Sequence, residues 1–89
     1  MIESTSPGHG PSAEILYVVV RSSSVAQVGY AKTSATLAIR FHNGAEYHYF
    51  DVPEHKYREL LVAPSVGGHF HDEIRDAGYR YACVRPASA

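Results

Sequence analysis

The clearest hydrophobic pattern in the chain is a strict alternation at residues 35–41. The apolar positions share one side of an extended backbone, and they are Ala35, Leu37, Ile39 and Phe41. A period of two is typical of a β-strand that is buried on one face. Residues 46–50 continue the alternation after a short polar break, and the β-branched, aromatic run at 16–20 also favours a strand.

The polar break at 42–45, HNGA, predicts a hairpin turn, and its length decides which side chains meet. A two-residue turn would pair Ile39 with His48 and place an imidazole on the apolar face. A three-residue loop with Gly44 in the left-handed conformation instead pairs Ile39 with Tyr47. Because a one-residue slip exchanges the two faces of a strand, the apolar pattern favours the three-residue loop.

This register assigns the two faces of the predicted hairpin. Tyr47 and Tyr49 turn toward the core, with their hydroxyls reaching a partner or the rim, which favours a structural role over a binding role for both rings. Arg40 then faces Glu46 across the strands. The outer face carries Arg40, His48 and Phe50.

The residues after this hairpin predict two helices and a last strand. Proline suits the first position of a helix, so a helix is expected from Pro53 until Pro64 stops it. Ser65 can cap a second helix, which would exit at Gly78. The run 79–84, YRYACV, reads as a strand. We therefore expect an α+β fold, in which a small antiparallel sheet of four or five strands has two helices packed on one face.

The domain organisation follows from length and composition. Residues 1–13 are rich in Ser, Pro and Gly and are expected to form a flexible tail, followed by a single domain at 14–86. An 89-residue chain buries only about 60 to 65 % of its unfolded surface, which leaves little room for a deep catalytic cleft. Cys83 stands alone, and no apolar run has the length of a membrane span, so the cytoplasm is the expected location.

The charge balance limits the classes of partner. Eight Lys and Arg residues stand against nine Asp and Glu residues, and the sequence pI is about 6.6. This is not the strongly basic composition of many nucleic-acid-binding proteins. Any phosphate-binding site must therefore depend on a few positive charges gathered in one place.

Residues 18–81 resemble the KTSC domain, a short module named for its occurrence at the C-terminus of some lysyl-tRNA synthetases and also found as small stand-alone bacterial proteins. The resemblance rests on the ordered spacing of Ser22-Ser23, Val28-Gly29-Tyr30, Leu37, Ile39, Phe41, Gly44, Tyr47-x-Tyr49, Val52-Pro53, Tyr57, Leu61, Ala63, Ser65, Gly68, Phe70, Ile74-Arg75 and Tyr79. The chain departs from the family pattern at Ala31, where aspartate is frequent, and at His71, where asparagine commonly follows the aromatic residue. The resemblance implies a small α+β fold and a suggested role in RNA binding.

These observations lead to the hypothesis of a non-enzymatic binding module for RNA. Its RNA-binding residues would be Arg40, His48, Phe50, Arg75 and Arg80. In this hypothesis Phe50 stacks on a base and Arg40 meets a phosphate, with Arg75 or Arg80 at the rim. The alternatives are a protein-interaction or homodimer module that uses a sheet face or edge, and an enzyme too poorly marked to name.

The segment 65–68, SVGG, presents a second candidate site. Glycine in the first turn of a helix costs about 1 kcal/mol relative to alanine, so something must favour it here. Either the helix start packs closely on a neighbouring element, or its bare N–H groups bind an anion. The anion site would be formed by Ser65, Gly67 and Gly68, although no lysine follows to complete a P-loop.

Metal binding and catalysis are poorly supported by the sequence. His69 and His71 lie two positions apart, on nearly opposite sides of the predicted helix, and cannot coordinate the same ion. The acidic residues at 72, 73 and 76 are typical of a solvated helix face. The chain contains no Gly-x-Ser-x-Gly motif, and Cys83 lies in an apolar strand context. We expect no metal, no cofactor and no enzymatic activity.

Overall fold

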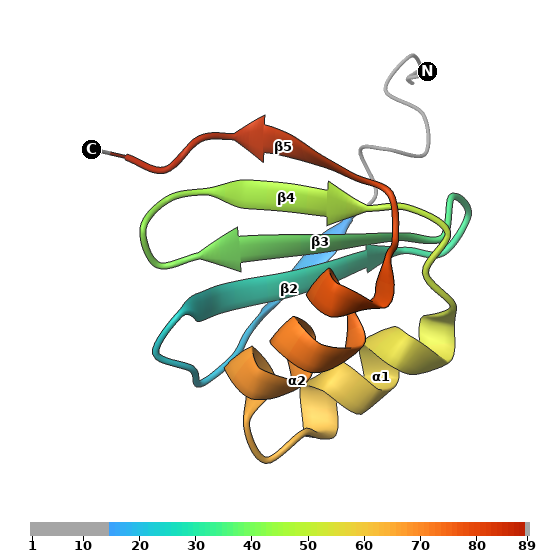
Figure 1. Ribbon diagram of the computed structural model, residues 1–89, viewed down its shortest axis with the longest axis horizontal. Helices are drawn as coiled ribbons and strands as arrows, with labels where there is room; N and C mark the ends of the chain where they lie inside the picture. The colour runs from blue at the N-terminus through green and yellow to red at the C-terminus, as the bar shows by residue number, and fades with distance from the viewer. Residues whose placement is uncertain (1–14, 89) are drawn as a thin grey trace, which may run out of the picture.

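The computed structural model describes residues 15–88, so the predicted tail at 1–13 lies outside the described residues. Five antiparallel strands form one sheet in the order β1-β2-β3-β4-β5, and two helices cover one of its faces (Figure 1). The elements in chain order are β1 (Leu16–Val19), β2 (Val25–Ala31), β3 (Thr36–Phe41), β4 (Glu46–Tyr49), α1 (Glu54–Val62), α2 (Val66–Glu73), the 3-10 helix η4 (Arg75–Ala77) and β5 (Tyr81–Arg85). The predicted α+β class is confirmed.

The predicted hairpin register between β3 and β4 is also confirmed. Ile39 pairs with Tyr47, and the N–H of Phe41 donates to the carbonyl of Ala45 at 2.8 Å, which closes a three-residue loop. Gly44 has φ of 93°, in the left-handed region that a residue with a side chain rarely adopts. The apolar alternation therefore selected the register that the turn chemistry can accommodate.

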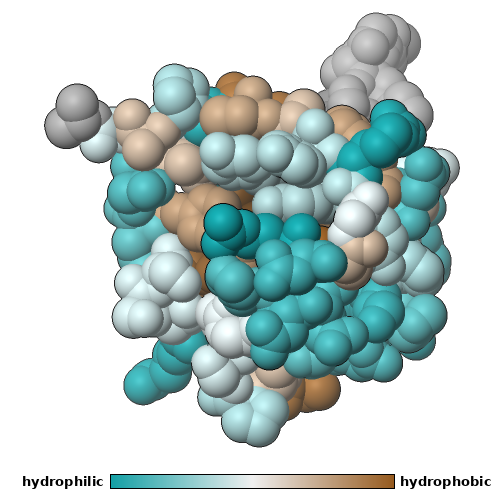
Figure 2. Space-filling model, in the orientation of Figure 1, coloured by the Kyte–Doolittle hydropathy of each residue, from teal (hydrophilic) through white to brown (hydrophobic). Residues whose placement is uncertain are grey.

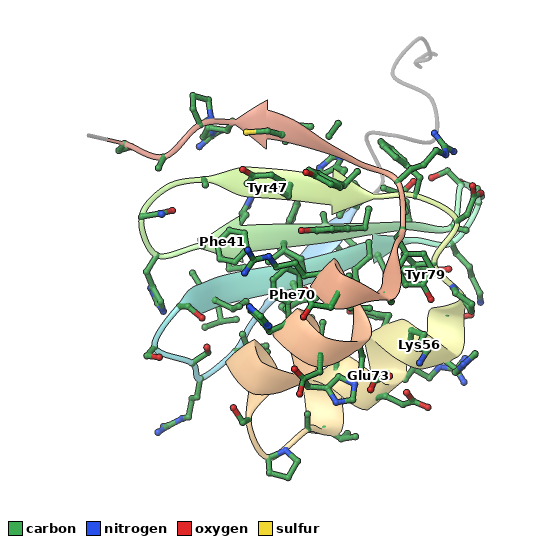
Figure 3. All side chains as sticks on the ribbon, viewed as in Figure 1. Phe41, Tyr47, Lys56, Phe70, Glu73 and Tyr79 are labelled. Atoms are coloured by element: carbon green, nitrogen blue, oxygen red, sulfur yellow. The ribbon has the colours of Figure 1, made fainter. Side chains whose placement is uncertain are left out.

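The core lies between the sheet and the helices. The largest fully buried side chains come from the strands, α1, the loop before α1 and the junction of α2 with η4: Leu37, Ile39, Leu60, Ile74, Val25, Val28 and Val52. The start of α1 is held by Tyr30, whose ring stacks on that of Tyr57 at 5.3 Å and whose hydroxyl donates to the carbonyl of Val52. The ion pair between Lys56 of α1 and Glu73 of α2, at 3.0 Å, ties the helices together (Figure 3).

Several predicted boundaries differ from the structure. The strand expected from residue 35 begins at Thr36, because Ala35 takes φ of 51° in the turn. The second helix ends at Glu73, and the chain continues as η4 until Gly78 turns it at φ of 91°. This break keeps Ile74 buried while redirecting the chain toward β5, which starts at Tyr81.

The helices leave part of their own side of the sheet uncovered. In Figure 1 they lie beside β2 and β3, while β4 and β5 extend beyond them. Tyr81 of β5 is consequently 63% exposed although its side chain lies on the helix side. No helix within residues 15–88 is long and apolar enough to cross a membrane.

Candidate functional site

A groove of about 500 Å³ lies on the helix side of the sheet, where β4 and β5 extend past α2. Five aromatic side chains line it: Phe41, Tyr47, Tyr49, Phe70 and Tyr81. Its polar lining includes Ser24, His71, Arg75 and Asp76. Figure 2 shows apolar, brown atoms between the pale side chains of the strands and the polar, teal side chains of the helices. This volume falls within the range of small-ligand sites, which is about 300 to 1,000 Å³.

Strand pairing builds the aromatic wall of this groove. Tyr49 lies directly opposite Tyr81 across β4 and β5, with ring centroids 5.5 Å apart. Tyr47 lies two residues before Tyr49 on the same face, and its ring centroid is 5.9 Å from that of Tyr81. Such spacings fall in the range of favourable aromatic pairs. The period of two in β4 and β5 therefore places three tyrosines in one surface.

The floor of the groove is part of the core. Phe70 of α2 packs edge-on against both Phe41 and Tyr49, with ring centroids 5.6 Å away in each case. Figure 3 shows Phe41, Tyr47 and Phe70 converging from β3, β4 and α2. Tyr49 is buried, Tyr47 is half-buried and Tyr81 is exposed. The exposure of the tyrosines therefore increases from the floor of the groove to its rim.

The opposite, polar wall comes from the end of α2 and from η4. The guanidinium of Arg75 donates to Nε2 of His71 at 2.7 Å, so Nε2 accepts and the neutral ring carries its proton on Nδ1. Nδ1 of His71 lies 3.5 Å from a carboxylate oxygen of Asp76. The three side chains form a row of alternating donor and acceptor groups along the rim, and the Asp76 side chain is 59% exposed.

The helix-free face of the sheet carries a second polar cluster, centred on Glu46. Oε1 of Glu46 accepts from Nε of Arg40 at 2.8 Å, and Oε2 lies 3.0 Å from Nε2 of His48. The hydroxyl of Tyr17 also donates to Oε2. The Arg40 guanidinium carbon lies 3.5 Å from the centre of the Tyr17 ring, and its NH1 donates to Gln27 at 3.2 Å.

Burial and hydrogen bonding compete at this carboxylate. Burial acts to raise the pKa of Glu46, but the donors Tyr17, Arg40 and His48 outweigh it and hold that pKa at about 2. Burial, followed by the hydrogen bond to Glu46, raises the pKa of Tyr17 to about 12. The Glu46 side chain is only 8% exposed. Arg40 and His48, both predicted to bind RNA, are thus already engaged with a buried partner.

The remaining predicted RNA-binding residues divide between the two faces. Arg80 lies over the ring of Phe50 at 5.3 Å and pairs with Asp51 at 3.1 Å. Both Phe50 and Arg80 line a hollow of about 330 Å³, together with His48. Arg75 lies in the groove on the opposite face. The structure does not bring the five predicted residues together as one site.

The groove itself was missed by the sequence reasoning. Tyr81 was predicted only as part of the last strand. His71 was considered only as a metal ligand, and Asp76 was assigned to a solvated helix face. A usable signal was the aromatic alternation at 47 and 49 combined with a tyrosine in the last strand, since neighbouring antiparallel strands align alternate side chains on one face. The sequence did not show that the helices would leave this part of the sheet uncovered.

Comparisons with known proteins identify the family to which this architecture belongs. The family model of the KTSC domain matches residues 21–85. This chain belongs to the KTSC domain family. The crystal structure of a KTSC domain protein from Yersinia pestis matches with a TM-score of 0.72 and 27% identity, covering 79% of this chain and 97% of that one. The resemblance inferred from the motifs is confirmed.

Two curated relatives extend the KTSC comparison. An uncharacterised protein of Stutzerimonas stutzeri is 38% identical over 64 residues, which cover 72% of this chain and 90% of that protein. A lysine–tRNA ligase of Trichormus variabilis is 44% identical over 46 residues, which cover 52% of this chain and 8% of the ligase. The similarity to the ligase is therefore confined to a small segment of that enzyme.

In this KTSC domain the predicted anion site at the start of α2 has internal partners. The hydroxyl of Ser65 accepts from the N–H of Gly68 at 3.2 Å, which is the ordinary helix cap. A Cβ at Gly67 would lie 3.0 Å from the hydroxyl oxygen of Ser24 and 3.1 Å from that of Ser22. The loop before β2 thus approaches the helix closely, which supports the packing explanation for Gly67.

Histidine and acidic side chains gather at one place within residues 15–88. His71, Asp72 and Asp76 offer ligand atoms within 4.8 Å of one another, and all three are exposed. This group of three differs from the pair His69 and His71, which the sequence analysis considered as metal ligands and rejected. The contacts of His71 with Arg75 and Asp76 account for the cluster without an ion.

Proposed function

We propose that this KTSC domain is a non-enzymatic module that binds single-stranded RNA in the aromatic groove. The observation that carries the proposal is the meeting of the exposed Tyr81 ring and the half-buried Tyr47 ring with Arg75 across a groove of about 500 Å³. Unpaired bases stack on aromatic side chains, and a neighbouring cation meets the backbone phosphate. The volume suits a single nucleotide.

The affinity should come chiefly from stacking. Each base stacked on an aromatic residue contributes about 1 to 3 kcal/mol. Arg75 is the only lysine or arginine that lines the groove within residues 15–88, and the chain has a net charge of −1. The counterion contribution is therefore small, and we expect binding in the micromolar range or weaker.

The groove is a better candidate than the helix-free face that the sequence suggested. On that face Arg40 and His48 are bound to Glu46, so a phosphate would have to compete with a buried carboxylate. Phe50 and Arg80 line a smaller hollow on this face, and Arg80 is paired with Asp51. A shallow site of this kind provides one ring, compared with several in the groove.

The family comparison supports an RNA context for the proposal. A lysine–tRNA ligase carries a similar segment, and that enzyme is named for acting on tRNA. A module of this size can add a contact to an RNA without any chemistry of its own. Residence in the cytoplasm is part of the same proposal.

Protein interaction is the second candidate function, and the first strand favours it. β1 lies at the sheet edge and consists of Leu-Tyr-Val-Val, with no charged residue to discourage pairing with another chain. Leu16 is 80% exposed and Val19 is 75% exposed. Light scattering of the full chain over a range of concentrations would reveal self-association through this edge.

Titration of labelled single-stranded RNA at two salt concentrations tests the RNA proposal. Tyr81→Ala should weaken binding by about 5- to 150-fold, which corresponds to one lost stacking contact. Phe50→Ala is the matched control, because it removes an aromatic ring from the other face, and it should leave the affinity unchanged. Absence of saturable binding below about 1 mM would overturn the proposal. A larger effect of Phe50→Ala than of Tyr81→Ala would move the site to the helix-free face.

A further inference from the structure

The rim of the groove carries a carboxylate as well as a cation. Asp76 lines the groove, and it follows Arg75 directly in η4. A carboxylate repels phosphate, so a site for the backbone alone would gain nothing from Asp76. The side chain is exposed, and one of its oxygens lies 3.5 Å from Nδ1 of His71. Each oxygen still has capacity to accept further hydrogen bonds.

An ionised carboxylate can only accept hydrogen bonds, and this restricts which base it can recognise. The Watson–Crick edge of guanine presents two adjacent donors, N1–H and the 2-amino group, which can meet both carboxylate oxygens. Adenine and cytosine each present a single amino donor beside a ring nitrogen acceptor, and uracil presents a single N–H between two carbonyls. Guanine therefore matches a carboxylate best.

The neighbouring arginine completes the match. O6 of guanine is an acceptor that lies next to N1–H. The guanidinium of Arg75 has five N–H donors, so it can donate to O6 and still meet the backbone phosphate. Arg75 and Asp76, consecutive in η4, thus offer a donor and an acceptor in the lining of the same groove as the tyrosines of β4 and β5. A base stacked on Tyr81 would direct one of its edges toward Arg75 and Asp76.

We propose that the groove selects an unpaired guanine, with its ring stacked on Tyr81 and its Watson–Crick edge on Asp76. This inference rests on the proposed RNA-binding function and adds the identity of the base. Recognition of the base edge, rather than neutralisation of phosphates, would then supply the specificity of a domain with so little positive charge.

Short oligouridines with a single variable central base provide the test. The central positions to compare are guanine, inosine, which lacks the 2-amino group, adenine and uracil, all titrated with EDTA present to keep metal ions off the exposed histidine and aspartates. The guanine oligomer should bind at least about fivefold more tightly than the adenine and uracil oligomers, with inosine between them. Asp76→Asn should abolish this preference while leaving the weaker binding of oligouridine.

Asp72→Asn is the matched control, since Asp72 is a neighbouring exposed carboxylate that is not part of the groove lining. It should keep the guanine preference. Equal binding of all four oligomers, or a guanine preference that survives Asp76→Asn, would overturn the inference while leaving RNA binding intact. Failure of every oligomer to bind would overturn the proposed function itself.

Discussion

Each face of the sheet carries a tyrosine, an arginine and a histidine around a carboxylate, but in different settings. On the helix-free face Tyr17, Arg40 and His48 surround the carboxylate of Glu46. In the groove Tyr81, Arg75 and His71 accompany the carboxylate of Asp76. The side chain of Glu46 is 8% exposed and that of Asp76 is 59% exposed.

Burial of the carboxylate accounts for the different roles that we assign to the two clusters. A buried carboxylate must be matched by donors from the protein itself, so the Glu46 cluster is closed and serves stability. An exposed carboxylate is satisfied by water, which a ligand can displace. Residue type alone therefore does not distinguish a structural network from a binding site.

The largest expected effect is on the free energy of unfolding after loss of the buried carboxylate charge. Glu46→Gln should destabilise the fold by about 2 to 4 kcal/mol, because Arg40 and Tyr17 lose their shared acceptor in a desolvated position. Asp76→Asn is the matched change in the groove and should alter stability by less than about 0.5 kcal/mol. Urea unfolding midpoints for the two variants measure the contrast, and similar losses from both would remove the distinction between the clusters.

Acid should weaken the Glu46 cluster in a defined range of pH. The pKa of Glu46 is about 2 in the fold, below its ordinary value of 4.5, so its stabilisation is complete above about pH 4.5 and is lost as the pH falls toward 2. The loss attributable to this group is up to about 3 kcal/mol. Unfolding free energies measured between pH 6 and pH 2.5 should therefore converge for the wild type and Glu46→Gln. A constant difference across this range would contradict the lowered pKa.

Two glycines test how closely each face is packed. A Cβ at Gly29 would lie 2.6 Å from Cγ2 of Ile15, 3.1 Å from the carbonyl oxygen of Leu16 and 3.2 Å from Cδ2 of Tyr17. Gly29→Ala should therefore displace Ile15 and Tyr17, weaken the contact of Tyr17 with Glu46 and cost about 1 to 3 kcal/mol. At Gly67 the atoms nearest to an added Cβ are the side-chain oxygens of Ser24, at 3.0 Å, and Ser22, at 3.1 Å, which need to shift by only a few tenths of an ångström. Alanine is also the better helix former, so Gly67→Ala should change stability by less than about 1 kcal/mol. Thermal melts of both variants would show whether Gly29 is the more costly site.

The smallest effect concerns salt. Arg75→Gln should reduce the salt dependence of RNA binding by about one phosphate contact and lower the affinity modestly. Arg80→Gln is the matched control on the other face and should leave the slope unchanged. The slope of log K against log salt concentration for each variant measures this. An effect of Arg80→Gln equal to that of Arg75→Gln would show that both faces meet the nucleic acid.

Much of the fold was predictable from local rules. The alternation at 37, 39 and 41 and the left-handed Gly44 together predict the β3–β4 register, because only one loop length keeps imidazole and carboxylate off the apolar face. The same reasoning placed Arg40 opposite Glu46. The two helix starts followed from Pro53 and Ser65, whose backbone preferences act within a few residues, whereas the second helix ends at Glu73 and not at Gly78 as predicted.

The availability of each charged group could not be predicted in the same way. Arg40 was expected to meet phosphate, yet a tyrosine from β1, 29 residues before Glu46, helps close a network around their shared carboxylate. Such a partner is brought near only when the sheet assembles. Local patterns contain no information about burial at that distance in the chain.

The sequence by itself determined the α+β class with an antiparallel sheet of four or five strands, the hairpin register and membership of the KTSC family, since each depends on periodicity, turn chemistry or ordered spacing. The tertiary structure alone decided that the helices leave part of β4 and β5 uncovered and that Arg75 and Asp76 of η4 line the same groove as Tyr47, Tyr49 and the exposed Tyr81. The physical reason is that the groove exists where the helices do not cover the sheet. That depends on how helices of a given length pack against a sheet of a given width, and on which carboxylates remain in contact with water.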